Sequence, residues 1–271
     1  MNKVIFIDWS VFMFRAITGS LNNPNIPSTY IGLSMIISNL KRIGITPDDR
    51  VIIACDKGKS WRKNIDSSYK ANRKAGREKL PINWDEQFAK FDWLLGKIDE
   101  ATDFNIVGAD SLEADDWLIV GARFFKDNEV ILVTTDSDLE QAFSYSNVKI
   151  FSPMKKCKGG KGAYKIPPPN FNVYKLISQK IRKETADNLT SEILSQDDYE
   201  KRMQIVNLLE LPENIENTIR ERLSNLEDKK SNIDLLPFDN LRARFRDIYN
   251  SKKVISYEDS MKKVKKKRKK K

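Results

Sequence analysis

The chain has 271 residues, of which 40% are hydrophobic, enough to bury the core of one large domain, and no run of 18 apolar residues that could cross a membrane. It has no histidine, which excludes Ser-His-Asp and Cys-His catalysis and histidine metal sites, and its two cysteines give neither a disulfide framework nor a zinc spacing. The net charge is +10, but nine Lys and Arg lie in residues 262–271, and the other 39 basic residues nearly balance the 38 acidic ones. We therefore expect a cytosolic protein whose hydrolytic chemistry would use carboxylates, lysines and hard metal ions.

Short runs of apolar and β-branched residues predict buried strands, and each is followed by a helical pattern. The predicted strands are Lys3–Ile7, Val51–Ala54, Phe104–Val107 and Val130–Val133. The predicted helices around them are Val11–Leu21, Tyr30–Ile43, Ser60–Gly76, Trp84–Glu100 and Glu113–Phe125. This alternation predicts an α/β domain in which a parallel, or mixed, sheet is wrapped by helices.

The pattern changes after a further short strand at Lys149–Phe151. Residues Lys155–Pro169 are rich in Lys, Gly and Pro and predict a flexible basic loop, since their glycines match no phosphate-binding motif. Helical patterns then cover Val173–Lys183, Tyr199–Leu209, Ile215–Leu223 and Leu241–Tyr249. We expect an α/β catalytic domain at residues 1–165, a mostly helical subdomain at 166–255 and a disordered basic tail at 256–271.

Acidic residues follow every one of the four main predicted strands. They are Asp8, then Asp56, then Glu113, Asp115 and Asp116, and finally Asp136 and Asp138. The carboxyl ends of parallel strands share one edge of a sheet, so we expect these acids to converge there. Their repulsion would raise their pKa values unless divalent cations stood between them, and carboxylate oxygens suit Mg²⁺ or Mn²⁺. The alternative for each acid alone is structural, as a helix N-cap or part of an acidic first turn.

A strongly basic segment, residues 57–79, starts directly after Asp56. Its nine Lys and Arg are opposed by only two acids. Trp61 and Tyr69 are interleaved and could stack on bases. Four of the cations have the spacing of one helix face: Lys70, Arg73, Lys74 and Arg77. The segment favours phosphate binding beside the acids, and the alternative is a solvated charged face.

Four sequence blocks, in this order and separation, resemble the signatures of the 5′→3′ exonuclease and flap endonuclease family. They are Ile7-Asp8 with Phe14-Arg15-Ala16; Trp61-Arg62 with Tyr69-Lys70-Ala71-Asn72-Arg73; Glu113-Ala114-Asp115-Asp116; and Thr135-Asp136-Ser137-Asp138-Leu139-Glu140-Gln141. The blocks span residues 7–141, with weaker similarity to about Tyr249, and the chain most resembles the stand-alone RNase H branch of phages.

The resemblance implies a metal-dependent hydrolase that cleaves DNA or RNA–DNA hybrids from or near a 5′ end, in primer or flap removal during replication. It implies two Mg²⁺ or Mn²⁺ ions held by the acids above, with Lys70 and Arg73 as catalytic residues at the scissile phosphate. The segment after Asp56 would form a helical arch that admits a single-stranded 5′ end. The further nucleic-acid contacts that we expect are Arg62, Lys63, Tyr69, Lys74 and Arg77. We also expect a cytosolic monomer, with viral origin as one option.

The resemblance weakens downstream, where the family has Gly-Asp-x-x-Asp-Asn before the glycine-rich hairpins of a helix–three-turn–helix element. Here residues 183–188 are Lys-Glu-Thr-Ala-Asp-Asn, and no glycine follows. We expect Asp187 to be a metal ligand and Glu184 to replace the first acid, while the sequence leaves the duplex-binding element and any potassium site undefined. The tail could bind nucleic acid, replication proteins or a nuclear import receptor, or only solubilise the chain. Two other functions stay open: a catalytically silent junction-binding protein and a PIN-type ribonuclease.

Overall fold

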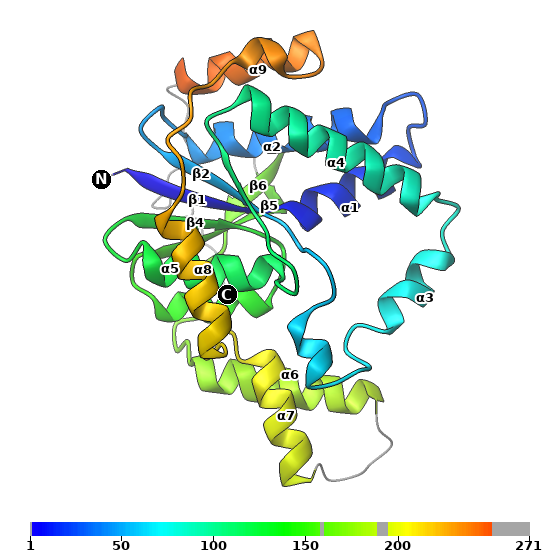
Figure 1. Ribbon diagram of the computed structural model, residues 1–271, viewed down its shortest axis with the longest axis vertical. Coiled ribbons are helices and arrows are strands. Elements are labelled where there is room, and N and C mark those ends of the chain that lie inside the picture. Colours follow the sequence, from blue (N-terminus) through cyan, green and yellow to red (C-terminus); the bar gives the residue numbers. More distant parts are fainter. Residues whose placement is uncertain (1, 158–159, 189–194, 251–271) are drawn as a thin grey trace, which may run out of the picture.

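A six-stranded mixed sheet lies at the centre of the molecule, in the order β3-β2-β1-β4-β5-β6 (Figure 1). This computed structural model describes residues 2–157, 160–188 and 195–250, and the side chains of Lys74, Cys157, residues 182–188 and residues 249–250 lie outside that description. All neighbouring strands are parallel except β6, which pairs antiparallel with β5. The strands are β1 Lys3–Asp8, β2 Arg50–Ala54, β3 Asn105–Val107, β4 Glu129–Val133, β5 Val148–Cys157 and β6 Gly160–Tyr164.

Helices cover both faces of the sheet. In Figure 1, α2, α4 and α9 lie above it, α1 lies to its right, α5 and α8 lie below it, and α6 and α7 lie further down. The helices are α1 Trp9–Ser20, α2 Ser28–Ile43, α3 Asn72–Glu78, α4 Trp84–Ala101, α5 Ala114–Phe124, α6 Val173–Asn188, α7 Gln196–Val206, α8 Glu213–Ser224 and α9 Asp239–Asn250. Short 3-10 helices are η1 Trp61–Asn64, η2 Asp138–Ser144 and η3 Ile233–Leu235. The predicted fold class, a mixed sheet wrapped by helices, is confirmed.

Alternating side chains along each central strand build two separate cores. In β1, Ile5 and Ile7 face the core under α1, α2, α4 and α9, whereas Val4 and Phe6 face the core under α5 and α8. Helix α5 packs so closely on β1 that a Cβ at Gly121 would stand 2.2 Å from the Phe6 ring. This contact needs glycine, because any side chain at position 121 would meet the Phe6 ring, and it sets the close packing of α5 on β1.

The helices after residue 165 do not all pack together. Two of them join the cores of the sheet, and two form a cluster of their own. Helix α8 contributes Ile219 and Leu223 to the lower core, and α9 contributes Leu241 and Phe245 to the upper core. Helices α6 and α7 instead bury a small cluster of their own, which includes Ile177. Helices beyond residue 165 therefore complete both cores, and the division into a domain at residues 1–165 and a helical subdomain at 166–255 remains a proposal. The predicted tail 256–271 lies outside the described residues.

The expected flexible loop Lys155–Pro169 is wrong in its first half, where the end of β5 and all of β6 form an antiparallel hairpin. Gly160 and Gly162 have φ values of 125° and 104°, a conformation that glycine adopts without strain. Backbone pairing between the two strands therefore decides the structure of a segment whose Lys and Gly content disfavours strands.

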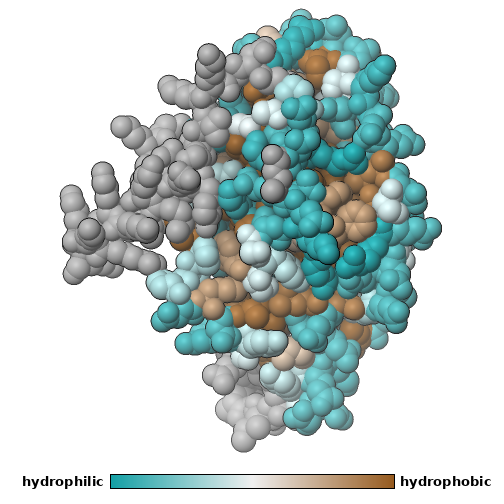
Figure 2. All heavy atoms as spheres, turned by 90° about the vertical axis from the view of Figure 1, so that its left-hand side faces the viewer, coloured by the Kyte–Doolittle hydropathy of each residue, from teal (hydrophilic) through white to brown (hydrophobic). Residues whose placement is uncertain are grey.

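Hydrophobic residues reach the surface only in limited areas of the face shown in Figure 2, mainly a band across its lower half. The rest of that face is predominantly hydrophilic. Within the residues that the structure describes, no helix combines the length and the apolar character needed to cross a membrane.

Candidate active site

The carboxyl edge of the sheet gathers acids from separate strands. Asp8 ends β1 and is only 3% exposed, and its carboxylate accepts hydrogen bonds from Ser10 Oγ at 2.8 Å and from Thr134 Oγ1 at 2.9 Å. It also accepts from Val11 N and so caps α1. Burial first, and then the charge of Asp56, raise the pKa of Asp8 to about 6, although its hydrogen bonds oppose the shift.

Asp115 lies in the first turn of α5 and faces the same acids. Burial raises the pKa of Asp115 well above its usual range, and the charges of Asp136, Asp8 and Asp56 raise it further. Asp56 is exposed and accepts a hydrogen bond from the Ala114 backbone N at 2.8 Å, which ties the end of β2 to the start of α5. These four acids therefore share one electrostatic environment with too little positive charge.

Glu113, immediately before α5, is instead surrounded by donors. Its Oε1 lies 2.5 Å from Lys70 Nζ, and its Oε2 accepts from Arg62 Nη1 at 2.9 Å and from Tyr69 Oη at 3.0 Å. Burial of the carboxylate raises its pKa, but Lys70 and Arg62 outweigh that effect, and the pKa of Glu113 is lowered overall. The backbone of Lys70 has a φ of 58°, in the left-handed region, and forms a turn just before α3. From this turn the side chain of Lys70 reaches Glu113.

Asp116 is adjacent to Asp115 but lies in a buried network of protein donors. Its side chain is 0% exposed, and it accepts hydrogen bonds from Arg62 Nη2 at 2.7 Å, Trp61 Nε1 at 3.1 Å and the Glu113 backbone N at 3.0 Å. The last contact is half of a capping box at the start of α5. A role for Asp116 as a metal ligand remains a prediction, but every described contact of its carboxylate is with protein donors.

The cations of the basic segment, residues 57–79, do not all lie on one exposed face, because Arg62 is buried against Glu113 and Asp116. Arg62 is 1% exposed, so its expected contact with nucleic acid does not fit its burial, and neither does base stacking by the buried Trp61. The expected helix Ser60–Gly76 is wrong in its extent, because η1 ends at Asn64 and α3 starts only at Asn72. Lys70 therefore does not share a helix face with Arg73. It reaches the acids through a turn.

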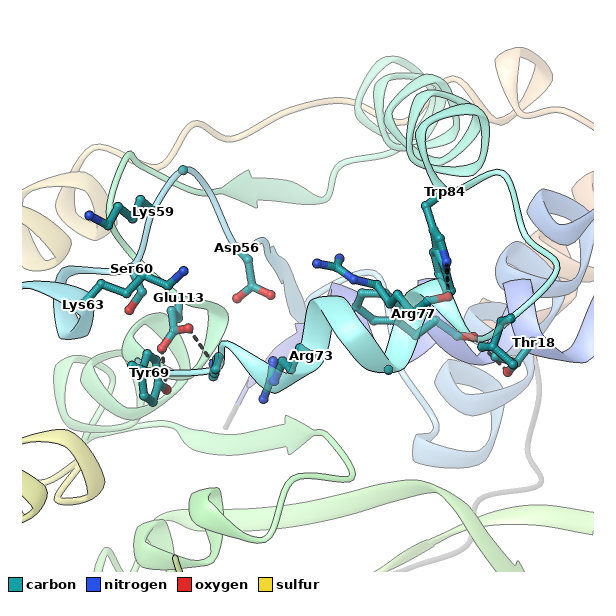
Figure 3. Close-up of a pocket in the computed structure, with 15 residues that line it drawn as sticks. Thr18, Asp56, Lys59, Ser60, Lys63, Tyr69, Arg73, Arg77, Trp84 and Glu113 are labelled. Carbon is teal, nitrogen blue, oxygen red and sulfur yellow. Dashed lines mark hydrogen bonds and ion pairs between the residues drawn. The ribbon is translucent and has the colours of Figure 1, made fainter. Parts of the chain in front are cut away.

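A cavity of about 840 Å³ lies between the basic segment and the acids (Figure 3). In Figure 3, Asp56 and Glu113 lie at one end and Trp84 and Thr18 at the other, with α3 running between them. Its cationic lining comes from Lys59, Lys63, Lys70, Arg73 and Arg77. Phe14, Leu80 and Trp84 make the other end apolar, and Trp84 Nε1 donates to the Arg77 carbonyl at 3.0 Å. Anionic and aromatic groups would both find partners here.

Of the remaining predicted site residues, Asp136 and Asp138 follow β4 near the other acids, whereas the side chains of three others lie outside the residues that the structure describes. Asp138 is ion-paired with Lys180 of α6, and Asp136 accepts from the Asp138 backbone N at 2.8 Å. Glu184 and Asp187 lie in α6, but their side chains are outside the described residues, as is that of Lys74.

The donor set fits hard divalent cations. Carboxylate oxygens predominate, and the pKa values of Asp8 and Asp115 are raised first by burial and then by the charges of neighbouring acids, so a cation bound there would favour their ionised forms. Among the described residues, no group of three acidic or cysteine side chains is arranged closely enough to hold a metal ion.

Two polar residues near the acids, Thr134 and Gln141, were given no role in the sequence analysis. Thr134 Oγ1 donates to Asp8 and accepts from the Asp136 backbone N at 3.0 Å, which links the ends of β1 and β4. Gln141 is fully buried and holds the segment after α7, since it donates to the Val206 carbonyl at 2.8 Å and accepts from Leu208 N at 3.0 Å. Only their positions beside acidic motif residues could have drawn attention to them.

Comparisons with known proteins identify the family and the fold of the chain. Ribonuclease H of Enterobacteria phage T4 is 27% identical over 128 residues, which cover 46% of this chain and only 42% of that relative. The structure of the T5 D15 protein co-crystallized with metal ions aligns with a TM-score of 0.53 at 17% identity, covering 83% of this chain and 99% of that one, which shows a shared fold. The family model of the 5′-3′ exonuclease N-terminal resolvase-like domain matches residues 3–165. The chain therefore belongs to the 5′-3′ exonuclease family.

Proposed function

We propose that this chain is a metal-dependent nuclease that hydrolyses phosphodiesters of DNA or RNA–DNA hybrids at or near a 5′ end. The observation that carries the proposal is the gathering of Asp8, Asp56, Asp115 and Asp136 at one edge of the sheet, where burial and then the charges of the other three raise the pKa of Asp115. A protein that only bound nucleic acid would gain nothing from unneutralised carboxylates facing phosphates. Membership of the exonuclease family supports the same conclusion.

The proposed cofactors are two Mg²⁺ or Mn²⁺ ions. Asp8, Asp56, Asp115 and Asp136 would hold them, with Glu113 and Asp138 at the margin and Asp187 and Glu184 from α6. When bound, such ions polarise a phosphodiester and lower the pKa of water. The T5 D15 protein, which shares this fold, was co-crystallized with metal ions, and this supports metal binding in general.

The chain's own cations would position the phosphate. Lys70 Nζ lies 2.5 Å from Glu113, so its charge stands at the boundary between the acids and the cavity. Arg73 is exposed on α3 and lines the same cavity. Together they would neutralise the charge that grows on the phosphate oxygens during hydrolysis, and Lys63 and Arg77 would hold neighbouring phosphates.

The cavity favours a single strand over a duplex. At about 840 Å³ it has the dimensions of a site for a small ligand, and it joins a cationic end to an apolar, aromatic end. A single strand offers both a phosphate and an unpaired base, so flaps and frayed 5′ ends are the proposed substrates. Removal of primers or flaps during replication is the proposed role, in a cytosolic monomer that contacts replication proteins through its tail.

The decisive assay compares 5′-labelled flap, nicked and RNA–DNA substrates with Mg²⁺, and uses Asp136→Asn as the matched variant. We expect wild-type cleavage near the 5′ end, no cleavage with EDTA, and a variant that binds DNA as well or better but does not cleave, because one repelling charge is lost. Binding without cleavage by the wild type would indicate a silent junction-binding protein. Cleavage of single-stranded RNA alone would indicate a PIN-type ribonuclease.

A further inference from the structure

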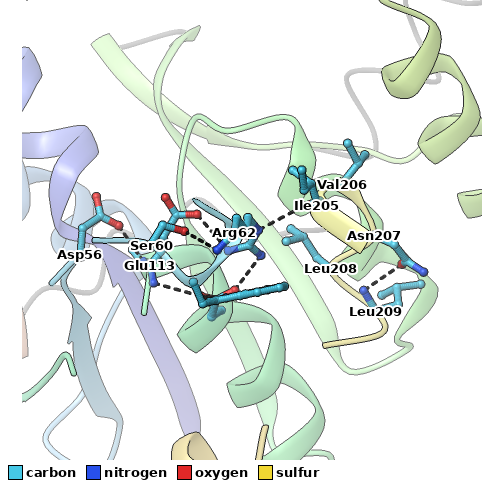
Figure 4. A network of polar contacts seen from close by, with 12 residues as sticks. Asp56, Ser60, Arg62, Glu113, Ile205, Val206, Asn207, Leu208 and Leu209 are labelled. Carbon is cyan, nitrogen blue, oxygen red and sulfur yellow. Dashed lines mark hydrogen bonds and ion pairs between the residues drawn. The ribbon is translucent and has the colours of Figure 1, made fainter. Parts of the chain in front are cut away.

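Arg62 is the most buried cation that touches the site, and it uses each guanidinium nitrogen for a different partner (Figure 4). Its Nη1 donates to Glu113 Oε2 at 2.9 Å, its Nη2 to Asp116 Oδ1 at 2.7 Å, and its Nε to the Ile205 carbonyl at 3.1 Å. The guanidinium also stacks on the Trp61 ring, with its carbon 4.5 Å from the ring centre. These bonds use three of its five N–H groups, and because the side chain is only 1% exposed, it is out of reach of a ligand in solution.

These contacts join three elements that are distant in the sequence. Arg62 belongs to η1, at the base of the basic segment, whereas Glu113 and Asp116 begin α5, and Ile205 lies in the last turn of α7. In Figure 4 the side chain of Arg62 lies between Glu113 and Ile205. A shift of any one element would break a charge-assisted hydrogen bond inside the protein, which is costly.

The bonds to Glu113 are also specific for one oxygen. Arg62 and Tyr69 both donate to Oε2, whereas the half-buried Lys70 donates to Oε1. Arg62 thus turns the carboxylate so that Oε1 points toward the cavity side, and it fixes the turn of α5 that carries Asp115.

We propose that Arg62 is a positioning residue of the nuclease site, which orients Glu113 and the first turn of α5 and holds both against the end of α7. The proposal rests on the proposed function, because it assigns this orientation to the binding of divalent cations. Arg62 acts through Glu113 and Asp115, and it touches neither the nucleic acid nor the metal. Lysine cannot replace it, because an ammonium group lacks the planar fork that reaches three fixed acceptors.

The test compares Arg62→Lys with a matched control, Arg123→Lys. Arg123 lies in the last turn of α5, at the end of the helix far from Glu113. Like Arg62, it pairs with a carboxylate, that of Glu216, and donates to a backbone carbonyl, that of Leu209. For each protein we would measure the melting temperature, equilibrium Mn²⁺ binding by electron paramagnetic resonance without substrate, and kcat and KM on a 5′ flap.

We expect Arg62→Lys to weaken Mn²⁺ binding and to lower kcat, each about 10- to 100-fold, as for other residues that orient metal ligands, with KM changed less than about twofold. Arg123→Lys should lower the melting temperature but leave Mn²⁺ affinity unchanged. A folded Arg62→Lys protein with wild-type Mn²⁺ affinity would overturn the proposal. A rise in KM alone would do so as well, because it would make Arg62 a nucleic-acid contact.

If Arg62→Lys does not fold, Trp61→Phe tests the same network with a smaller change. Phenylalanine keeps a ring under the guanidinium and removes only the bond from Nε1 to Asp116, so we expect Mn²⁺ binding to weaken roughly threefold. Unchanged Mn²⁺ affinity in this variant would also overturn the proposal. A wild type that binds Mn²⁺ but cleaves nothing would refute the proposed nuclease function alone, whereas a wild type without Mn²⁺ affinity would refute both.

Discussion

Asp8→Asn should stabilise the metal-free protein at neutral pH, although it removes a central residue of the site. Burial is the main reason why the pKa of Asp8 rises from 3.8 to about 6. A raised pKa means that the folded protein binds this proton more tightly than the unfolded chain does. The resulting stability is present at low pH and is lost as the pH rises through about 6.

The size of the effect follows from the shift. A change from 3.8 to about 6 corresponds to about 3 kcal/mol of lost stability for ionised Asp8 at pH 7.5, since each unit is about 1.36 kcal/mol. The amide of asparagine does not ionise, and its oxygen can still accept from Ser10 or Val11. In a chain of this size the gain should raise the melting temperature by roughly 5–10 °C.

The assay is thermal unfolding of wild type and Asp8→Asn in EDTA at pH 4 and pH 7.5, repeated with Mg²⁺. We expect the advantage of the variant at pH 7.5 to vanish at pH 4, and Mg²⁺ to stabilise the wild type more than the variant. Asp49→Asn is the control, because Asp49 is buried but paired with Lys3 at 2.7 Å, so its loss should destabilise at pH 7.5. A variant less stable than the wild type in EDTA at pH 7.5 would refute the reasoning.

Three further predictions concern activity. Lys70→Ala should lower the single-turnover rate on the order of 10²–10³ and change the dissociation constant much less; a loss of binding alone would make it an ordinary phosphate contact. Asp187→Ala should raise the Mg²⁺ concentration at half-maximal activity more than Glu184→Ala does, and the reverse order would show that the downstream motif is misplaced. Truncation after Ser260 should weaken DNA binding at low salt and flatten its log–log salt dependence by about 0.9 per lost phosphate contact, with an unchanged saturating rate. Equal slopes would mean that the tail does not touch nucleic acid.

Most of the sheet and the acids at its edge could be predicted from the sequence, because buried parallel strands have a strong local pattern and their carboxyl ends share an edge. The roles of adjacent acids could not. Asp115 and Asp116 are about 100° apart around a helix, so one faces the other strand ends and the other enters a buried network. Asp116 is the one that enters the buried network because it pairs with Arg62, which is 54 residues away in the sequence.

The burial of individual cations could not be predicted from the sequence either. A run of Lys and Arg predicts where positive charge lies, but not which side chain becomes buried against an acid. Arg62 and Lys63 are neighbours, yet Arg62 is buried with Asp116 and Glu113 whereas Lys63 lines the cavity. The helix expected over both was interrupted because Tyr69 and Lys70 make tertiary bonds to Glu113, which outweigh local helix propensity.

The balance of charge therefore divides the site into two halves with different electrostatics. On one side, Arg62 and Lys70 neutralise Glu113, and they lower its pKa despite burial. On the other side, Asp8 and Asp115 have raised pKa values because burial and like charges act on them together. A divalent cation gains most where negative charge is least neutralised, so the half with Asp8 and Asp115 should bind it first. Under the proposed function, Glu113 would serve as a ligand only if a cation displaced Lys70 from Oε1, and the lysine would then be free to face a phosphate in the cavity.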